Sequence, residues 1–180
     1  LLVEINSFAN PYPYVSKNIE CFIAQFFRQT GNEALIEEYA LEPFTLNVLD
    51  KRQTLTEKLV SLIRFSLSEN HIYDVAAKIR HFYDLHYLLK DEECKDYIYS
   101  EQFKIDFKVL LDHDRAIFDN PEGWNTMDIE QSPLLSDFSA LWANLKTTYM
   151  KELPAIAFSD IPDAEEVAAS FEKIANQLKS

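Results

Sequence analysis

Glycine is scarce in this chain, and its scarcity limits the folds that the chain can adopt. Only 2 of the 180 residues are glycine, against a usual share of about 7%. Glycine supplies the left-handed backbone of tight hairpin turns and allows close approach of a backbone to a phosphate, so few such loops can occur. We therefore expect a mainly helical protein.

The composition is that of a folded globular protein. Hydrophobic residues make up 47% of the chain, charged residues 26% and aromatic residues 13%, which argues against disorder. A chain of 180 residues can bury a substantial core. The longest apolar runs are far shorter than a membrane span and no signal peptide is visible, so we expect a cytoplasmic protein with no membrane partner.

The charge is negative and unevenly distributed. The formal net charge is −13, with 9 basic and 11 acidic residues in 1–90 but 8 and 19 in 91–180. A surface this acidic repels phosphate backbones, which argues against broad, non-specific binding of nucleic acid. A local basic cleft in the near-neutral first half remains compatible with the composition.

The hydrophobic pattern predicts a little β-structure followed by helices, an α+β fold that is mainly α. Residues 1–6 read as a strand, and residues 39–50 as an edge strand or a strand that starts after Pro43, since proline lacks an N–H group. We divide the chain into residues 1–53, with the strands, and residues 54–180, a helical, bundle-like subdomain. Helices are predicted over residues 16–31, 32–38, 54–68, 71–90, 100–118, 134–151 and 163–179.

The helix predicted over residues 54–68 places one lysine at the edge of its apolar face. Thr54 and Glu57 have the spacing of a capping box. Lys58 lies beside Leu62 at the border of the apolar arc, so its stem should be partly buried. Lys58 then either presents its ammonium to a phosphate, or pairs with Glu57 or another acid at the surface.

The next predicted helix carries Arg80 and Asp84 on neighbouring turns. They can form a local ion pair worth about 0.3–0.5 kcal/mol. The alternative is that Asp84 faces inward as a metal-assisting or proton-accepting carboxylate, with Arg80 neutralising an anion. His81 and His86 diverge by about 140° on a helix, so we interpret both as packing or surface residues.

The order of these two segments resembles a known family. Thr54–Leu59 (TLTEKL), followed about twenty residues later by Arg80–Leu85 (RHFYDL), is similar to the AbiEii/AbiGii toxins. These are nucleotidyltransferases of bacterial abortive-infection (phage defence) and type IV toxin–antitoxin systems. The segment Leu2–Asn6 (LVEIN) also resembles the family strand that follows the acidic, metal-binding strand.

The resemblance implies a polymerase-β-like core that transfers a nucleotide from an NTP, with Mg²⁺ held by acidic residues. The acceptor would be an RNA such as a tRNA, and a cognate antitoxin would be a partner. Residues 1–53 would be a remnant of the nucleotidyltransferase core. The implied site residues are Lys58 at the triphosphate, Asp84 near the acceptor or metal, Glu57, Arg80 and Tyr83 as nucleotide-binding or supporting residues, and Glu4 as a metal ligand.

Two motifs of the family do not occur in this chain. These are a Gly-Ser or Gly-Gly-Thr turn and an Asp-x-Asp strand; Asp112 and Asp114 have the second spacing but fall in a helical pattern, where alternate side chains diverge. Because the chain begins with Leu1 rather than methionine, we expect a fragment. Because the metal-binding carboxylates of the family are missing, we expect this fragment to be inactive alone and to bind neither Mg²⁺ nor NTP tightly. The alternative is a non-catalytic helical module whose acidic second half binds another protein.

Overall fold

The computed structural model describes residues 13–157 and 160–179, which divide into two compact units. One unit ends at Gln53 and the other begins at Thr54. Apart from two antiparallel strands, the regular elements in this part of the chain are helices, which confirms the predicted mainly α fold. The strand predicted over residues 1–6, including Glu4, lies outside the described residues. The interpretation of residues 1–53 as a nucleotidyltransferase remnant stays a prediction.

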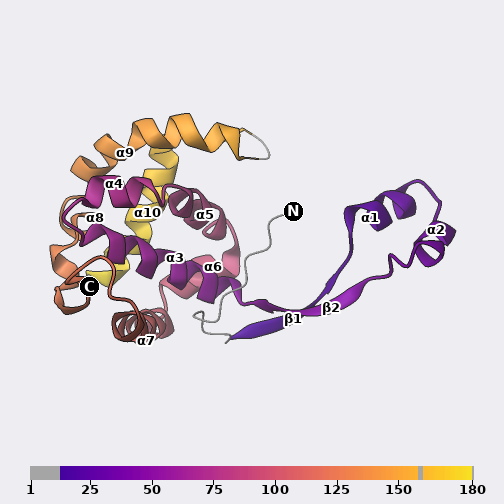
Figure 1. Ribbon diagram of the computed structural model, residues 1–180, viewed down its shortest axis with the longest axis horizontal. Coiled ribbons are helices and arrows are strands. Elements are labelled where there is room, and N and C mark those ends of the chain that lie inside the picture. The colour runs from indigo at the N-terminus through magenta and orange to yellow at the C-terminus, as the bar shows by residue number, and fades with distance from the viewer. Residues whose placement is uncertain (1–12, 158–159, 180) are drawn as a thin grey trace. The chain divides into compact units, whose positions relative to one another are not determined.

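The first unit is a two-stranded ribbon with two short helices. Strand β1 (Tyr14–Ile19) pairs antiparallel with β2 (Phe44–Leu49). Helices α1 (Phe22–Gln29) and α2 (Ala34–Glu38) connect the two strands at one end of the ribbon (Figure 1). Strand β2 begins directly after Pro43, which confirms one of the two predicted arrangements for this segment.

The helix predicted to start at Ser16 starts six residues later. Ser16 lies within β1 opposite Asn47, and its hydroxyl donates to the Asn47 side-chain oxygen at 2.9 Å. The helix begins at Phe22 because Cys21 caps it, its Sγ accepting from the Ala24 amide at 3.4 Å. The prediction was wrong because the strand depends on a partner 31 residues away in the chain, which local periodicity does not reveal.

The second unit is built from helices (Figure 1). Its first helix, α3, begins at Lys51, just before the division. The α-helices are α3 (Lys51–Ser66), α4 (His71–Ala76), α5 (Arg80–Leu88), α6 (Glu92–Ile98), α7 (Glu101–Ile117), α8 (Pro133–Ser136), α9 (Phe138–Glu152) and α10 (Ala164–Leu178). The 3₁₀ turns are η1 (Trp124–Thr126), η2 (Ile129–Gln131) and η3 (Leu153–Ala155). Two of these 3₁₀ turns and the short helix α8 lie between α7 and α9, and the third 3₁₀ turn follows α9.

Helix α3 begins earlier than the predicted cap at Thr54. The Asp50 carboxylate accepts from the Arg52 amide at 2.8 Å and from the Arg52 guanidinium at 2.9 Å. These hydrogen bonds from Arg52 lower the pKa of Asp50, against the opposing effect of burial. An aspartate that accepts from the first turn is a good start for a helix, so the helix extends to Lys51.

The single helix predicted over residues 71–90 is two helices. Between α4 and α5 the amides of Lys78 and Ile79 bond to carbonyls three residues back, at 2.9 and 3.0 Å. This tightening to 3₁₀ geometry breaks the α-helical repeat, and no proline or glycine marks it in the sequence. Helix α5 therefore takes its own direction, and its packing decides where Arg80 and Asp84 lie.

An aromatic cluster fixes α5 against the C-terminal helices. Phe82 of α5 is fully buried, with its ring centroid 5.2 Å from that of Trp142 on α9 and 5.0 Å from that of Phe171 on α10. Phe138 of α9 completes the cluster, 4.6 Å from Phe171. Helix α10 begins at a cap formed by Asp163, close to the predicted start of that helix at residue 163. In the part of the chain that the structure covers, no helix combines the length and apolar character that crossing a bilayer requires.

Replacing Phe82 with alanine should destabilise the second unit. The substitution removes a fully buried ring that contacts two other helices, and such changes cost about 3–5 kcal/mol in free energy of unfolding. Tyr73→Ala, in which an aromatic side chain 76% exposed on α4 is removed, is the matched control. Urea unfolding followed by circular dichroism compares the two, and equal midpoints would contradict the assignment of Phe82 to the core.

Candidate functional site

Lys58 and Asp84 form an ion pair that links two helices. The Lys58 Nζ on α3 lies 2.6 Å from the Asp84 Oδ2 on α5, and the two side chains are 22% and 30% exposed. The ion pair of Asp84 is therefore with a residue 26 positions away. Arg80 is exposed and has no ion pair among the described residues, so the local Arg80–Asp84 pair considered from the sequence does not form.

The packing of each helix explains why these side chains meet. On α3, Leu55 and Leu59 are fully buried, and Lys58 projects from the flank of that buried face. On α5, Phe82 and Leu85 are fully buried, which leaves Asp84 on the flank. The ammonium and the carboxylate thus sit at the edge of the core, where water screens their attraction less than at an open surface.

His81 lies one turn before Asp84 and borders the ion pair. Burial and then the nearby Lys58 lower the pKa of His81, Asp84 acts in the opposite direction, and the resulting pKa is about 4 instead of the ordinary 6.5. Its imidazole is therefore neutral at pH 7, and its Nδ1 is buried without a hydrogen-bond partner among the described residues. From the sequence, His81 was interpreted only as a packing or surface residue; its three-residue spacing from Asp84 on a helix was the available signal for a place in the site.

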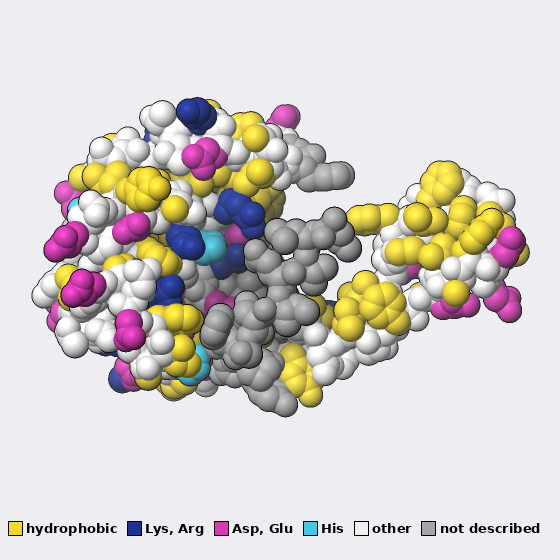
Figure 2. Space-filling model, in the orientation of Figure 1, with side chains coloured by type: hydrophobic (Ala, Val, Ile, Leu, Met, Phe, Trp, Pro, Cys, Tyr) yellow, Lys and Arg dark blue, Asp and Glu magenta, His cyan; other side chains and the backbone are white. Residues whose placement is uncertain are grey.

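Basic groups outnumber acidic ones around this pair. Lys78 and Arg80 both act on the pKa of His81 together with Lys58, whereas Asp84 is the one carboxylate in the described part of the chain that does so. Lys78 holds its ammonium 4.7 Å from the centroid of the Phe65 ring. Figure 2 shows basic side chains gathered around a histidine on the second unit. This is a local positive region in an acidic chain, of the kind the charge distribution allowed.

The remaining predicted site residues in the described part of the chain lie on α3 and α5, outside the Lys58–Asp84 ion pair. Tyr83 packs its ring on Tyr87, with centroids 4.8 Å apart, and burial followed by the neighbouring Tyr87 raises the pKa of its phenol. Glu57 is partly exposed on α3 next to Lys58. The roles of Glu57, Arg80 and Tyr83 stay predictions.

The described residues do not fit a magnesium ion. They contain no group of three or more histidine, cysteine, aspartate or glutamate side chains that could hold a metal. Asp84 is already neutralised by an ammonium at 2.6 Å. Asp112 pairs with Lys108 at 2.6 Å, and Asp114 contacts His113 at 3.4 Å, so these two aspartates serve separate local pairs, as their helical spacing predicted.

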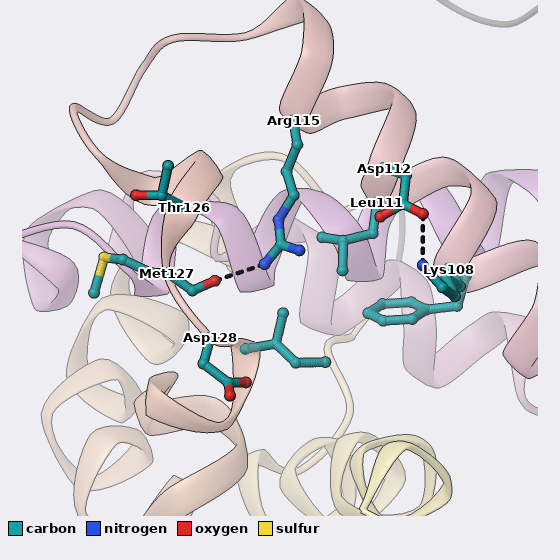
Figure 3. Close-up of a pocket in the computed structure, with 9 residues that line it drawn as sticks. Lys108, Leu111, Asp112, Arg115, Thr126, Met127 and Asp128 are labelled. Atoms are coloured by element: carbon teal, nitrogen blue, oxygen red, sulfur yellow. Dashed lines mark hydrogen bonds and ion pairs between the residues drawn. The ribbon is translucent and has the colours of Figure 1, made fainter.

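A pocket of about 530 Å³ lies between α7 and the 3₁₀ turns η1 and η2 (Figure 3). Arg115 extends into it, and its guanidinium donates to the Met127 carbonyl at 2.6 Å. Asp128 accepts from the Glu130 amide at 3.0 Å. The Arg115–Met127 bond ties the loop after α7 back onto that helix, so we interpret the pocket as a structural junction.

The fold and the site together define a mainly helical protein with a partly buried lysine–aspartate pair in a basic surround. A family model described as "Nucleotidyl transferase AbiEii toxin, Type IV TA system" matches residues 1–172. The chain therefore belongs to the AbiEii family of nucleotidyltransferase toxins of type IV toxin–antitoxin systems, and the resemblance seen in the sequence is confirmed. Neither a curated protein nor a solved structure matches the chain.

The Lys58–Asp84 pair should contribute measurably to stability. A double-mutant cycle with Lys58→Met and Asp84→Asn should give a coupling free energy of about 1 kcal/mol, since both groups are mostly buried. The control cycle uses Lys146→Met and Glu165→Gln, a pair whose side chains are 47% and 65% exposed, where the coupling should be smaller. Urea unfolding measures both, and equal coupling energies would show that burial does not strengthen the first pair.

His81 should make stability fall in acid. Its folded pKa of about 4 lies below the ordinary 6.5, so the unfolded chain binds the extra proton between those values and stability declines as pH falls from 6.5 to 4. The loss is at most about 3 kcal/mol. His81→Gln should flatten this slope, whereas His71→Gln on α4 should keep it; urea unfolding at several pH values compares them. An unchanged slope in His81→Gln would rule out this contribution.

Proposed function

We propose that this protein acts in nucleotide transfer from an NTP, with Lys58 binding the triphosphate and Asp84 lying beside the acceptor. The observation that carries the proposal is the 2.6 Å ion pair between them, held at the edge of the core between α3 and α5. A lysine ammonium is a compact charge suited to phosphate. Family membership supports the same reaction class.

The ion pair suggests how the site changes when a nucleotide binds. Without a nucleotide, Asp84 neutralises Lys58 and keeps its ammonium in place. The triphosphate competes for that ammonium, and its binding releases the Asp84 carboxylate. A free carboxylate can accept the proton of an attacking hydroxyl. The neutral His81 does not oppose the exchange, and the positive charges of Lys78 and Arg80 favour the arrival of an anion.

We infer that the remaining parts of the reaction come from outside the described residues. Mg²⁺ would be held by carboxylates that these residues do not provide, and Glu4 is a proposed contributor. The acceptor would be RNA, such as a tRNA, by analogy with the family alone, and an antitoxin would restrain the toxin. We propose that residues 1–180 alone bind NTP weakly and do not transfer it.

A non-catalytic interaction module is the second candidate. The observation that favours it is the acidity of residues 91–180, with 19 acidic and 8 basic side chains. Such a surface suits a basic protein partner. The two candidates differ in what Lys58 does, because a module has no need of a nucleotide.

Two substitutions at the pair should change NTP binding in opposite directions. Lys58→Ala should weaken binding about tenfold, because it removes a charge-assisted contact to phosphate. Asp84→Asn should tighten binding several-fold, because it removes the group that competes for the Lys58 ammonium. Each of the four NTPs is titrated into ¹⁵N-labelled protein and followed by NMR, with Lys146→Ala as the control lysine.

The outcomes separate the candidates. If both Lys58→Ala and Asp84→Asn lose NTP binding, the triphosphate does not replace Asp84 at the Lys58 ammonium. If neither substitution changes NTP binding, Lys58 is not part of the site and the non-catalytic interaction module is favoured. A parallel incubation with radiolabelled NTP, RNA and Mg²⁺ should give no transfer. Robust transfer by residues 1–180 would refute the proposal that this chain is inactive alone.

A further inference from the structure

A second pocket, on the other side of α5, gathers positive charge. It has a volume of about 410 Å³ and lies among α5, α6 and α10, lined by His86, Lys90, Lys95, Lys173 and their neighbours. His86 follows Asp84 by two residues, so the two side chains leave α5 about 200° apart. The pocket is therefore separate from the Lys58–Asp84 pair.

Three lysines line this pocket against one glutamate. Lys95 pairs with Glu92 at 3.3 Å, in an exposed contact. Lys90 holds its ammonium 4.7 Å from the centroid of the Tyr87 ring, and Lys173 has no ion pair among the described residues. On a chain with a net charge of −13, acidic partners are plentiful, so lysines left without them around one pocket point to an anionic ligand.

The buried imidazole of His86 supplies an independent observation. His86 is 5% exposed, and its Nδ1 lies 2.8 Å from the Ser170 hydroxyl oxygen. That hydroxyl donates its single hydrogen to the Glu166 carbonyl at 3.0 Å, so it accepts from His86, and the imidazole proton sits on Nδ1.

The other nitrogen of this ring is consequently an acceptor. The Nε2 of His86 is buried and has no hydrogen-bond partner among the described residues. Burial lowers the pKa of His86, and Lys90 adds to that effect, so the ring stays neutral. A buried acceptor without a donor is costly. A ligand that brings a hydrogen to donate would satisfy it.

We propose that this pocket binds a ribose phosphate group. The phosphate would lie between the ammonium groups of Lys90 and Lys173, with Lys95 at the rim, and a ribose hydroxyl would donate to the His86 Nε2. The volume is within the range of small-ligand sites. The group would come from a free nucleotide or from the phosphorylated end of an RNA, which share this chemistry. The proposal does not rest on nucleotide transfer, because no residue of the Lys58 site takes part.

The test uses ribose 5-phosphate as the probe and ¹⁵N-labelled residues 1–180. Titration should shift the amide signals of residues 86–99 and 170–173, and should shift the His86 Nε2 signal in a long-range ¹H–¹⁵N spectrum as it gains a donor. Inorganic phosphate should bind more weakly, and ribose alone should not bind. Signals that move around Lys58 instead, or no shift at all, would overturn the proposal.

Matched variants identify the groups responsible. Lys173→Ala and Lys90→Ala should each weaken binding about tenfold, whereas Lys151→Ala, an exposed lysine of α9 that does not line the pocket, should not. His86→Phe keeps a ring and removes the acceptor, so it should abolish the preference for ribose 5-phosphate over inorganic phosphate. Equal affinities in Lys173→Ala, Lys90→Ala and Lys151→Ala would refute the site.

Two further comparisons separate the sources and the two sites. The first comparison is between a 5′-phosphorylated ribotetranucleotide and ribose 5-phosphate. Tighter binding of the tetranucleotide would indicate that the site binds the end of an RNA, and equal or weaker binding would indicate that it binds a free nucleotide. Lys58→Ala should leave ribose 5-phosphate binding to this pocket unchanged. If Lys58→Ala loses NTP binding but still binds ribose 5-phosphate, the His86 pocket is a separate site. If Lys58→Ala loses the binding of both NTP and ribose 5-phosphate, the two sites are not independent and the proposal is overturned.

Discussion

The packing of Phe82 into the aromatic cluster of α9 and α10 sets the position of α5, and both sites depend on that helix. Its ring is fully buried between Trp142 and Phe171. Once this face is fixed, helical geometry directs Asp84 towards α3 and His86 towards α10. A shift of α5 along its neighbours would therefore move both groups together. One core contact thus couples two chemically different parts of the surface.

Much of the helical framework could be predicted because its signals are local. Helices were predicted to begin near residues 100 and 163, and α7 and α10 begin there, capped by Ser100 and Asp163. The start of β2 after Pro43 likewise follows from the missing N–H group of proline. Each of these depends on residues within one turn or one step of the chain.

The errors occurred where distant residues decide the structure. Residues 16–31 were predicted as a helix, yet Ser16 lies in a strand because Asn47 is opposite. The break between α4 and α5 has no proline or glycine to mark it. For the candidate site, the helical pattern placed Lys58 and Asp84 each on a flank, but their meeting depends on how α3 packs beside α5. The neutral state of His81 likewise arises from tertiary burial.

The two positive regions differ in how their charge is balanced, and that difference has a physical consequence. Lys58 has an internal carboxylate at 2.6 Å, so any anion that binds it must replace an existing interaction and its affinity is reduced accordingly. Lys173 has no such competitor among the described residues, so an anion there gains the full attraction. The first arrangement suits a substrate group that must be released after each reaction, because that group is bound weakly. Weak binding of the ground state also leaves more of the interaction for the transition state. The second suits a ligand that is held.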